Sequence, residues 1–219
     1  MPTDLRGASH RRPVRLPLFP LHAVLFPGGR LPLRIFEQRY IEMAKACLRD
    51  EASFGVCLIT RGDEVAKPGN EATPPEFAAI GTLATIRAWD MPELGILHVT
   101  AQGEARFSVR ATATQANGLI VGETTPVPAE PSVATGDAQR PLAQLLELLV
   151  ARIGAQNFPD ERAFDDATWV GYRLAELLPL PLSIKQSMLE MNDAEVRLAV
   201  LRQFLEQQGV LQALRDGKL

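Results

Sequence analysis

The segment from residue 16 to residue 49 most constrains the fold, because the spacing of its apolar residues changes along its length. It begins with two short apolar stretches, residues 16–19 and 23–26, and a proline follows each of them. Residues 27–29 read Pro-Gly-Gly, which is a turn signal because proline fixes φ and glycine accepts a positive φ. The segment therefore predicts two extended stretches around a turn.

After the turn, apolar and polar residues first alternate and then recur at a helical spacing. Leu31, Leu33 and Ile35 occupy every second position, as in a half-buried strand. Pro32 lacks an N–H for the sheet, so we expect this strand at an edge or near a bulge. An amphipathic helix is predicted over about residues 37–48, with an apolar face made of four residues: Tyr40, Met43, Ala44 and Cys47.

Strand patterns then continue to about residue 125. They cover residues 54–60, 78–89, 96–100, 105–111 and 119–125. Turns are expected at residues 90–95, at residues 102–104 and at Asn117-Gly118, and residues 61–75 read as a long surface loop. Several short strands at nearly regular spacing indicate a barrel or a sandwich.

The remainder of the chain is predicted to be helical. Residues 126–136 contain three prolines and read as a semi-stiff linker, in which Glu130 is expected at the solvated surface. Helices are predicted over residues 142–153, 165–178 and 183–191, with a final helix after residue 192. Ser183 and Asn192 are the expected caps of the last two, and the final helix is predicted to bury four residues before Gly209: Val196, Ala199, Val200 and Phe204. The expected division is a flexible tail (1–13), a barrel (14–127), a linker (128–137) and a helical subdomain (138–219).

Two sets of motifs resemble the N-terminal, substrate-binding domain of Lon proteases. The first set is LPLFPL at 16–21, VLFPG at 24–28 and LRIFEQRY at 33–40. The second set is LPLS at 180–183, followed by Lys185-Gln186 and Arg197-Leu198. The resemblance covers residues 14–208 and is to the free-standing bacterial form. It implies an α+β fold: a PUA-like, mainly antiparallel β-barrel with one early helix, followed by a C-terminal helical bundle, serving substrate binding.

Composition argues against several other classes of protein. The net charge is −3, so no general basic field would attract DNA. No apolar run approaches the roughly 20 residues of a membrane span, and the first ten residues are too polar for a signal peptide. The two cysteines, Cys47 and Cys57, make neither a metal spacing nor a disulfide framework. We therefore expect a cytoplasmic protein without membrane association.

No catalytic constellation is visible in the sequence. It contains no Gly-x-x-x-x-Gly-Lys-Ser/Thr phosphate-binding loop and no Gly-x-Ser-x-Gly elbow. The three histidines, His10, His22 and His98, lack neighbours at the spacing of metal ligands. The chain also has no room for a Ser-Lys peptidase domain after the matched region. The prediction is a protein that is not an enzyme and that uses no cofactor and no metal.

Two groups of residues are candidates for binding a protein partner. Arg34 and Tyr40, with Glu37 and Arg39, form either a polar patch that grips a partner or a salt-bridged latch between strand and helix. Trp89, Met91 and Leu94 surround a turn, where they either contact unfolded polypeptide or, in the case of Trp89, pack under the loop.

The function predicted from these observations is recognition of unfolded or degradation-prone polypeptides, either as an adaptor that presents substrates to a separate protease or by binding exposed apolar segments on its own. The alternative is a PUA-like protein that binds RNA or a small ligand. The sequence does not predict an oligomeric state.

Overall fold

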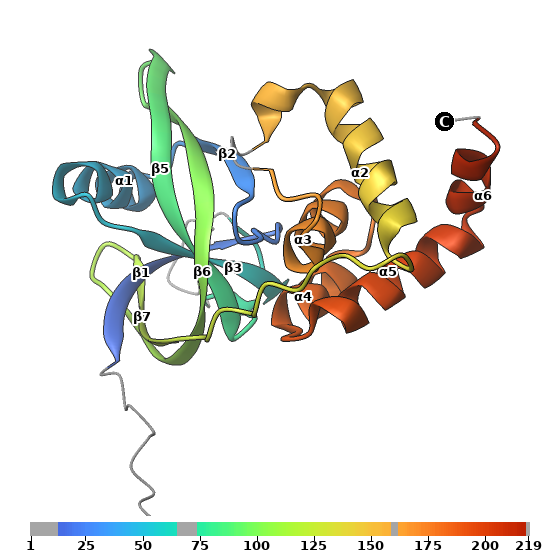
Figure 1. Ribbon diagram of the computed structural model, residues 1–219. Coiled ribbons are helices and arrows are strands. Elements are labelled where there is room, and N and C mark those ends of the chain that lie inside the picture. Colours follow the sequence, from blue (N-terminus) through green and yellow to red (C-terminus); the bar gives the residue numbers. More distant parts are fainter. Residues whose placement is uncertain (1–12, 65–73, 159–161, 218–219) are drawn as a thin grey trace, which may run out of the picture.

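The computed structural model describes residues 13–64, 74–158 and 162–217. Its first half is a closed five-stranded barrel (Figure 1). The barrel strands are β1 (Val14–Leu21), β3 (Phe54–Arg61), β5 (Ile80–Glu93), β6 (Ile96–Thr114) and β7 (Ile120–Pro126). Their order is β1-β7-β6-β5-β3, and a parallel pairing between β1 and β3 closes the ring, while the other neighbours are antiparallel. The structure confirms the predicted fold class.

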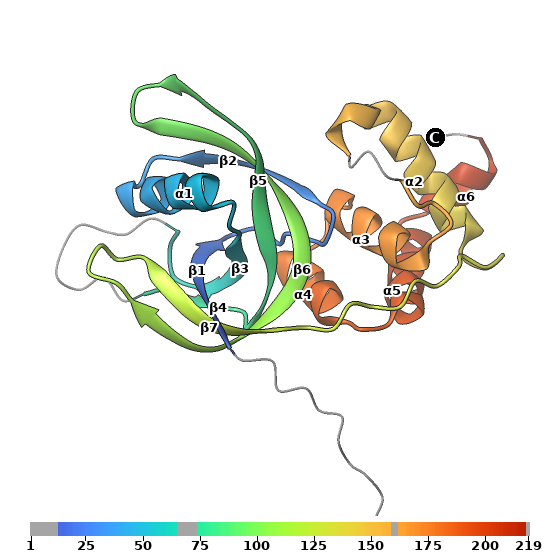
Figure 2. The same ribbon diagram turned by 60° about the vertical axis from the view of Figure 1, so that its left-hand side comes forward.

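Two further strands lie outside the ring. β4 (Glu76–Phe77) pairs with β3, and β2 (Arg30–Ile35) pairs with β6. The distal halves of β5 and β6 continue beyond the barrel as a hairpin, and β2 completes a three-stranded sheet with them (Figure 2). Because β2 pairs on one side only within the described chain, Pro32 occupies an edge strand, as predicted.

Helix α1 (Gln38–Asp50) confirms the predicted amphipathic helix and packs its apolar face against the barrel strands (Figure 1). Its buried residues pack with Phe19, Phe54, Leu97 and Val99 in one apolar cluster. The rings of Phe19 and Tyr40 stack with their centroids 4.0 Å apart. The change in the spacing of apolar residues along residues 16–49 therefore corresponds to a strand, a turn and a helix that share one core.

The second half is a bundle of helices, which we call the helical bundle. Its elements are α2 (Arg140–Ile153), η1 (Ala155–Asn157), α3 (Ala167–Leu177), α4 (Leu182–Glu190), α5 (Ala194–Gln207) and α6 (Val210–Arg215). Leucines on α2, α3 and α5 form its core, and Phe26, from the loop after β1, packs into that core. The ring of Phe26 lies 5.6 Å from that of Tyr172. The barrel segment thus contributes directly to the bundle.

A buried ionic network joins the barrel to the helical bundle. The two terminal guanidinium nitrogens of Arg197 (α5) donate to the Glu130 carboxylate, at 2.9 and 2.6 Å. Arg106 (β6) lies 3.5 Å from the same carboxylate and donates to the backbone carbonyls of Leu189 and Met191. The hydroxyl of Tyr172 also donates to Glu130. Burial and this hydrogen bond raise the pKa of Tyr172.

The Lys185-Gln186 motif has a structural role at the same junction. The side-chain amide of Gln186 donates to the carbonyl of Ile80, at the start of β5, over 2.9 Å. Lys185 donates to the carbonyl of Glu176, which holds α4 against α3. The motif therefore positions the bundle on the barrel.

Glu130 corrects one sequence-based expectation, because its side chain is buried rather than solvated. The residues that follow Glu130 in the chain lie beside the start of α3. The amide of Ala167 donates to the carbonyl of Val133, and the amide of Thr135 donates to the carbonyl of Asp165. The linker prediction rested on prolines and small residues. Those residues gave no indication that Arg106 and Arg197, which are distant in the sequence, would enclose Glu130.

The turn predicted at residues 102–104 was wrong, because β6 runs without interruption through them. Gly103 exchanges two backbone hydrogen bonds with Gly28 and Gly29, each of 2.8 Å. A Cβ atom at position 103 would lie 2.2 Å from the carbonyl oxygen of Phe26. Glycine is needed here for a close approach of two backbones. By contrast, the hairpin at Asn117-Gly118 is confirmed between β6 and β7.

Two helix caps and one helix face also differ from the prediction. Asp193, not Asn192, caps α5, and Asn192 instead accepts a hydrogen bond from Arg106. α4 begins at Leu182 after Pro181, without a side-chain cap from Ser183. The face that α5 buries consists of Ala194, Arg197, Leu198, Leu201 and Leu205, so Val196, Ala199 and Val200 are exposed. The spacing of apolar residues predicted the wrong buried face of α5, because the buried network places Arg197 in the core.

Candidate protein-binding surface

The end of the three-stranded sheet gathers exposed apolar side chains. The fractional exposures are 56% for Phe36, 59% for Trp89, 37% for Met91 and 101% for Leu94. These four residues lie at the ends of β2 and β5 and in the turn between β5 and β6. We call them, together with Arg34 and Glu93, the tip surface. The hairpin that carries it points away from the helical bundle (Figure 2).

The tip surface is exposed because α1 covers Leu97 and Val99 of the hairpin but, in the described chain, leaves the end of the hairpin uncovered. Every residue of β5 from position 87 to position 93 is exposed. The tight turn is made by Leu94 and Gly95, and Gly95 has a φ of +85°. Trp89 thus lies at the surface rather than under the loop.

Two open hollows adjoin the tip surface, and Arg34 lines both of them. One hollow, of about 470 Å³, is lined by three residues from each strand: 32–34 of β2, 88–90 of β5 and 98–100 of β6. The other, of about 370 Å³, is lined by Arg34, Phe36 and Ile96. The hollows offer two neighbouring places for apolar side chains.

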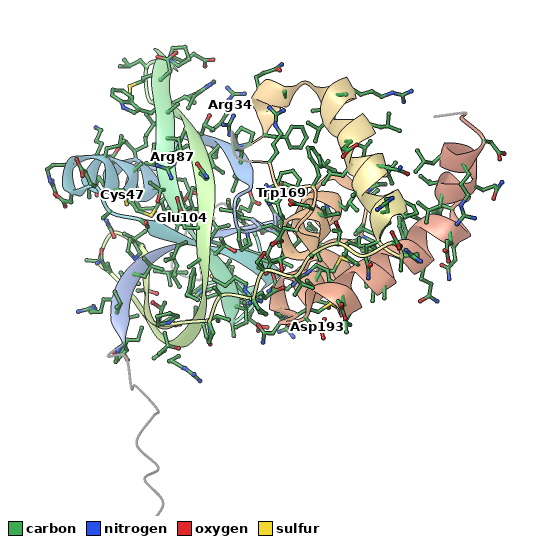
Figure 3. All side chains as sticks on the ribbon, in the orientation of Figure 1. Arg34, Cys47, Arg87, Glu104, Trp169 and Asp193 are labelled. Atoms are coloured by element: carbon green, nitrogen blue, oxygen red, sulfur yellow. The ribbon has the colours of Figure 1, made fainter. Side chains whose placement is uncertain are left out.

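The charged groups of this region are loosely engaged. Arg34 and Glu93 lie 3.8 Å apart, with side chains 65% and 60% exposed. A carboxylate oxygen of Asp90 accepts a hydrogen bond from the amide of Met91, at 2.7 Å. Further along the hairpin, Arg87 donates to Glu104 and Gln102 (Figure 3). Arg34 therefore retains donors for a partner.

The other residues of the first candidate group form a latch. Arg39 pairs with Glu37 at 2.8 Å and donates to the carbonyl of Gly118 at 2.9 Å. Tyr40 lies in the barrel core, where burial raises its pKa to about 12. The structure brings Arg34 to the same end of the sheet as Trp89, Met91 and Leu94, with Arg34 and Trp89 on opposite faces of it. It places Tyr40 beneath that surface and not in it.

Sequence reasoning missed Phe36 and His98. Phe36 stands in the LRIFEQRY motif between the buried Ile35 and Glu37 of the latch, so it was not singled out as exposed. His98 aligns with Arg34 and Asp90 on the neighbouring strands, and its buried Nε2 has no hydrogen-bond partner among the described residues. Only the strand register brings these three residues together.

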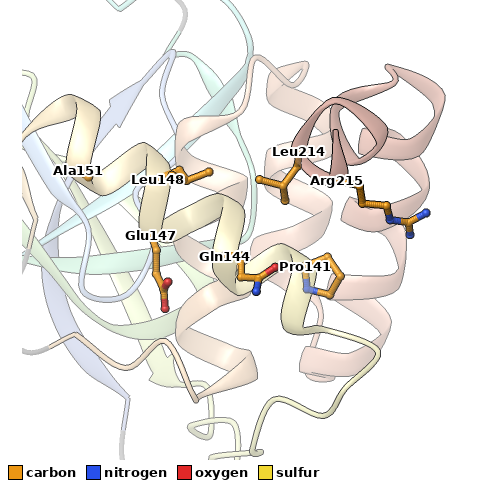
Figure 4. Close-up of a pocket in the computed structure, with 7 residues that line it drawn as sticks. All are labelled: Pro141, Gln144, Glu147, Leu148, Ala151, Leu214 and Arg215. Atoms are coloured by element: carbon orange, nitrogen blue, oxygen red, sulfur yellow. The ribbon is translucent and has the colours of Figure 1, made fainter. Parts of the chain in front are cut away.

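A further hollow, of about 520 Å³, lies between α2 and α6. Leu148 and Leu214 point toward one another across it, and Glu147 and Arg215 stand at its rim (Figure 4). It lies within the bundle and not between the barrel and the helices.

The described residues also bear on metals and membranes. Within residues 13–64, 74–158 and 162–217, no three His, Cys, Asp or Glu side chains gather as metal ligands would. Across the same ranges, no helix has the length and apolar character needed to span a bilayer. Cys47 and Cys57 are buried free thiols, and burial raises the pKa of Cys57 to about 12.

The fold and its exposed hairpin define a barrel-and-bundle module with an exposed apolar surface at one end. A model of the ATP-dependent protease La (LON) substrate-binding domain matches residues 15–207. The chain therefore belongs to the family of Lon substrate-binding domains. That domain is non-catalytic.

Solved structures and longer relatives agree with this assignment. The Lon N-terminal domain protein from Xanthomonas campestris is 37% identical, with a TM-score of 0.69 over 86% of this chain and 96% of that one. The N-terminal domain of Mycobacterium avium complex Lon protease shares the fold, with 18% identity and a TM-score of 0.54 over the same shares of the two chains.

Lon protease 2 of Myxococcus xanthus is 27% identical over 205 residues, which are 88% of this chain and 24% of that protein. Lon protease of Anaeromyxobacter dehalogenans is 36% identical over 99 residues, 44% of this chain and 11% of that protein. The chain thus spans about a quarter or less of these relatives.

Proposed function

We propose that this protein binds polypeptide segments with exposed apolar side chains, and that the tip surface makes the contact. The observation that carries the proposal is the grouping of Phe36, Trp89, Met91 and Leu94 at one end of a rigid sheet. Exposed apolar groups at a loop tip are typical of binding surfaces, and aromatic residues contribute most of the energy in such contacts.

Binding would bury these side chains against apolar side chains of the partner, while Arg34 donates to backbone carbonyls. Ordering an unfolded segment costs entropy, so we expect a modest affinity, in the range of tens of micromolar. In its finer form, the proposal is that the protein acts as an adaptor, presenting such segments to a separate protease.

The test is the binding of reduced, carboxymethylated α-lactalbumin, a permanently unfolded protein, to the full chain. We expect the double variant Trp89→Ala/Leu94→Ser to bind at least tenfold more weakly than the unchanged protein. The control is Leu148→Ser/Val196→Ser, which removes exposed apolar groups of the helical bundle and should leave binding unchanged. Equal losses in both variants, or no binding at tens of micromolar, would reject the proposal.

The adaptor role needs a separate measurement. Degradation of the same unfolded protein by a purified Lon protease should become faster when this protein is added, and the tip variant should not accelerate it. The sequence-based alternative predicts binding of RNA or a metabolite. A fluorescence-anisotropy titration with RNA at two salt concentrations and a thermal-shift screen of metabolites test that alternative.

A further inference from the structure

From the tip surface and its two hollows, we infer that the face of the three-stranded sheet carrying Arg34 is a track for an extended polypeptide with apolar side chains at alternate positions. The inference rests on the proposed function and specifies the class of segment that is bound. Such segments are those that become buried strands in folded proteins.

The strand register builds the track. Residues directly opposite one another in an antiparallel sheet project from the same face. Arg34 aligns with His98 and His98 with Asp90, so these side chains project in a row from one face of the sheet. The three strands form the floor, and the side chains of Arg34 and Asp90, on either side of His98, form the walls. The two walls are two strand spacings apart, about 9.6 Å, which accommodates one extended chain above β6.

The two hollows set the spacing of the bound side chains. One hollow lies on the Pro32 side of Arg34, and the other lies on the Phe36 side. The lining residues on this segment, 32–34 for one hollow and Arg34 and Phe36 for the other, are displaced by two positions, which corresponds to about 7 Å. Side chains at positions i and i+2 of an extended peptide are separated by this same distance, and they project from one face of it.

The charges of the walls complement the edges of such a peptide. An extended chain presents carbonyl and N–H groups along both of its edges. The exposed guanidinium of Arg34 on β2 would donate to carbonyls at one edge, and the Asp90 carboxylate on β5 would accept from N–H groups at the other. Between them, His98 offers a buried Nε2 that lacks a partner in the described structure.

A bound helix would not fit the same features. With its side chains, a helix is about 10–12 Å wide, and its backbone N–H and C=O groups are already paired along the axis. It would therefore fill neither hollow at the required spacing and would leave Arg34 and Asp90 without backbone partners. The track should distinguish the two conformations.

Two synthetic peptides of identical composition provide the test. In one twelve-residue peptide, leucine and valine alternate with serine and glutamine. In its isomer, the same apolar residues stand at the i, i+3, i+4 spacing of a helix. Fluorescence anisotropy of the labelled peptides with the full chain should show at least fivefold tighter binding of the alternating peptide.

Arg34→Met tests the wall, because it keeps the side chain's length and removes its donors. We expect it to weaken binding of the alternating peptide about fivefold to tenfold and to abolish the preference over the isomer. Arg61→Met is the matched control, since Arg61 is also an exposed arginine that pairs with a glutamate, Glu76, on another strand. It should leave both affinities unchanged.

The outcomes separate the track from the proposed function. Equal binding of the two peptides, or an Arg34→Met variant that still prefers the alternating one, overturns the track. If Trp89→Ala/Leu94→Ser weakens the binding of unfolded lactalbumin in that case, the proposed function stands. If neither peptide nor the unfolded protein binds at tens of micromolar, both ideas fail.

Discussion

The junction between barrel and bundle and the tip of the hairpin use the same pair of residue types in opposite ways. At the junction, Arg197 and Glu130 are buried, and their nitrogens and oxygens are joined by two hydrogen bonds. At the tip, Arg34 and Glu93 are exposed and 3.8 Å apart. The first pair holds two parts of the molecule together, while the second leaves its groups accessible to a partner. Burial and the surrounding hydrogen-bond donors, rather than residue type, distinguish a structural ion pair from an exposed pair at a candidate binding surface.

The largest expected effect comes from breaking the buried pair. Glu130→Ala leaves Arg106 and Arg197 buried without their carboxylate, which should destabilise the fold by about 3–5 kcal/mol. Urea unfolding followed by circular dichroism measures this change. If the free energy of unfolding falls by less than about 1 kcal/mol, water or a rearrangement compensates both arginines. The buried pair would then not differ in stabilising role from the exposed pair at the tip.

A second comparison uses two phenylalanines from the same sequence region. Phe26 is fully buried in the bundle core, whereas Phe36 belongs to the tip surface. Phe26→Ala should lower the free energy of unfolding by about 3–5 kcal/mol, because it leaves a cavity. Phe36→Ala should change it by no more than about 0.5 kcal/mol. Similar losses in both variants under the same unfolding conditions would contradict the assignment of Phe36 to a surface.

The third prediction concerns Gly103, where β6 meets the loop after β1. Gly103→Ala places a Cβ atom against the backbone of Phe26 and should destabilise the protein by about 1–3 kcal/mol. Gly136→Ala is the control, because the nearest atom there belongs to the flexible side chain of Gln139. Thermal unfolding of both variants decides the matter: an unshifted midpoint for Gly103→Ala would be incompatible with the close backbone approach.

The smallest effect is expected at the exposed pair. Glu93→Ala should alter stability by less than about 0.5 kcal/mol, since exposed ion pairs contribute little. Its unfolding midpoint in urea should match that of the unchanged protein. A destabilisation comparable to that of Glu130→Ala would mean that the tip is structural.

The elements that could be predicted from the sequence are those whose patterns are local. The alternation of Leu31, Leu33 and Ile35 and the helical spacing after Glu37 both gave the observed strand and helix. The helix predicted over residues 165–178 is observed as α3, which Asp166 caps by accepting from the amide of Trp169. The apolar residues around the β5–β6 turn could likewise be seen as exposed candidates.

The features that escaped prediction depend on residues far apart in the chain. Glu130 meets Arg197 only when α5 folds back over the segment after β7, and Gly103 meets Phe26 only when β6 lies beside the loop after β1. His98 joins Arg34 and Asp90 through the pairing of three strands. Neither composition nor the spacing of apolar residues along the chain indicates such distant partners.

The length of β6 has a mechanical consequence. This single strand of 19 residues lies between β2 and β5 near the tip and carries Arg106 into the buried network at its other end. The eleven residues from Ile96 to Arg106 extend over about 34 Å, and hydrogen bonds to neighbouring strands support them. If a segment held at the tip were pulled, the force would be transmitted along β6 and would shear the hydrogen bonds to its neighbouring strands. The helical bundle would anchor the other end of the strand.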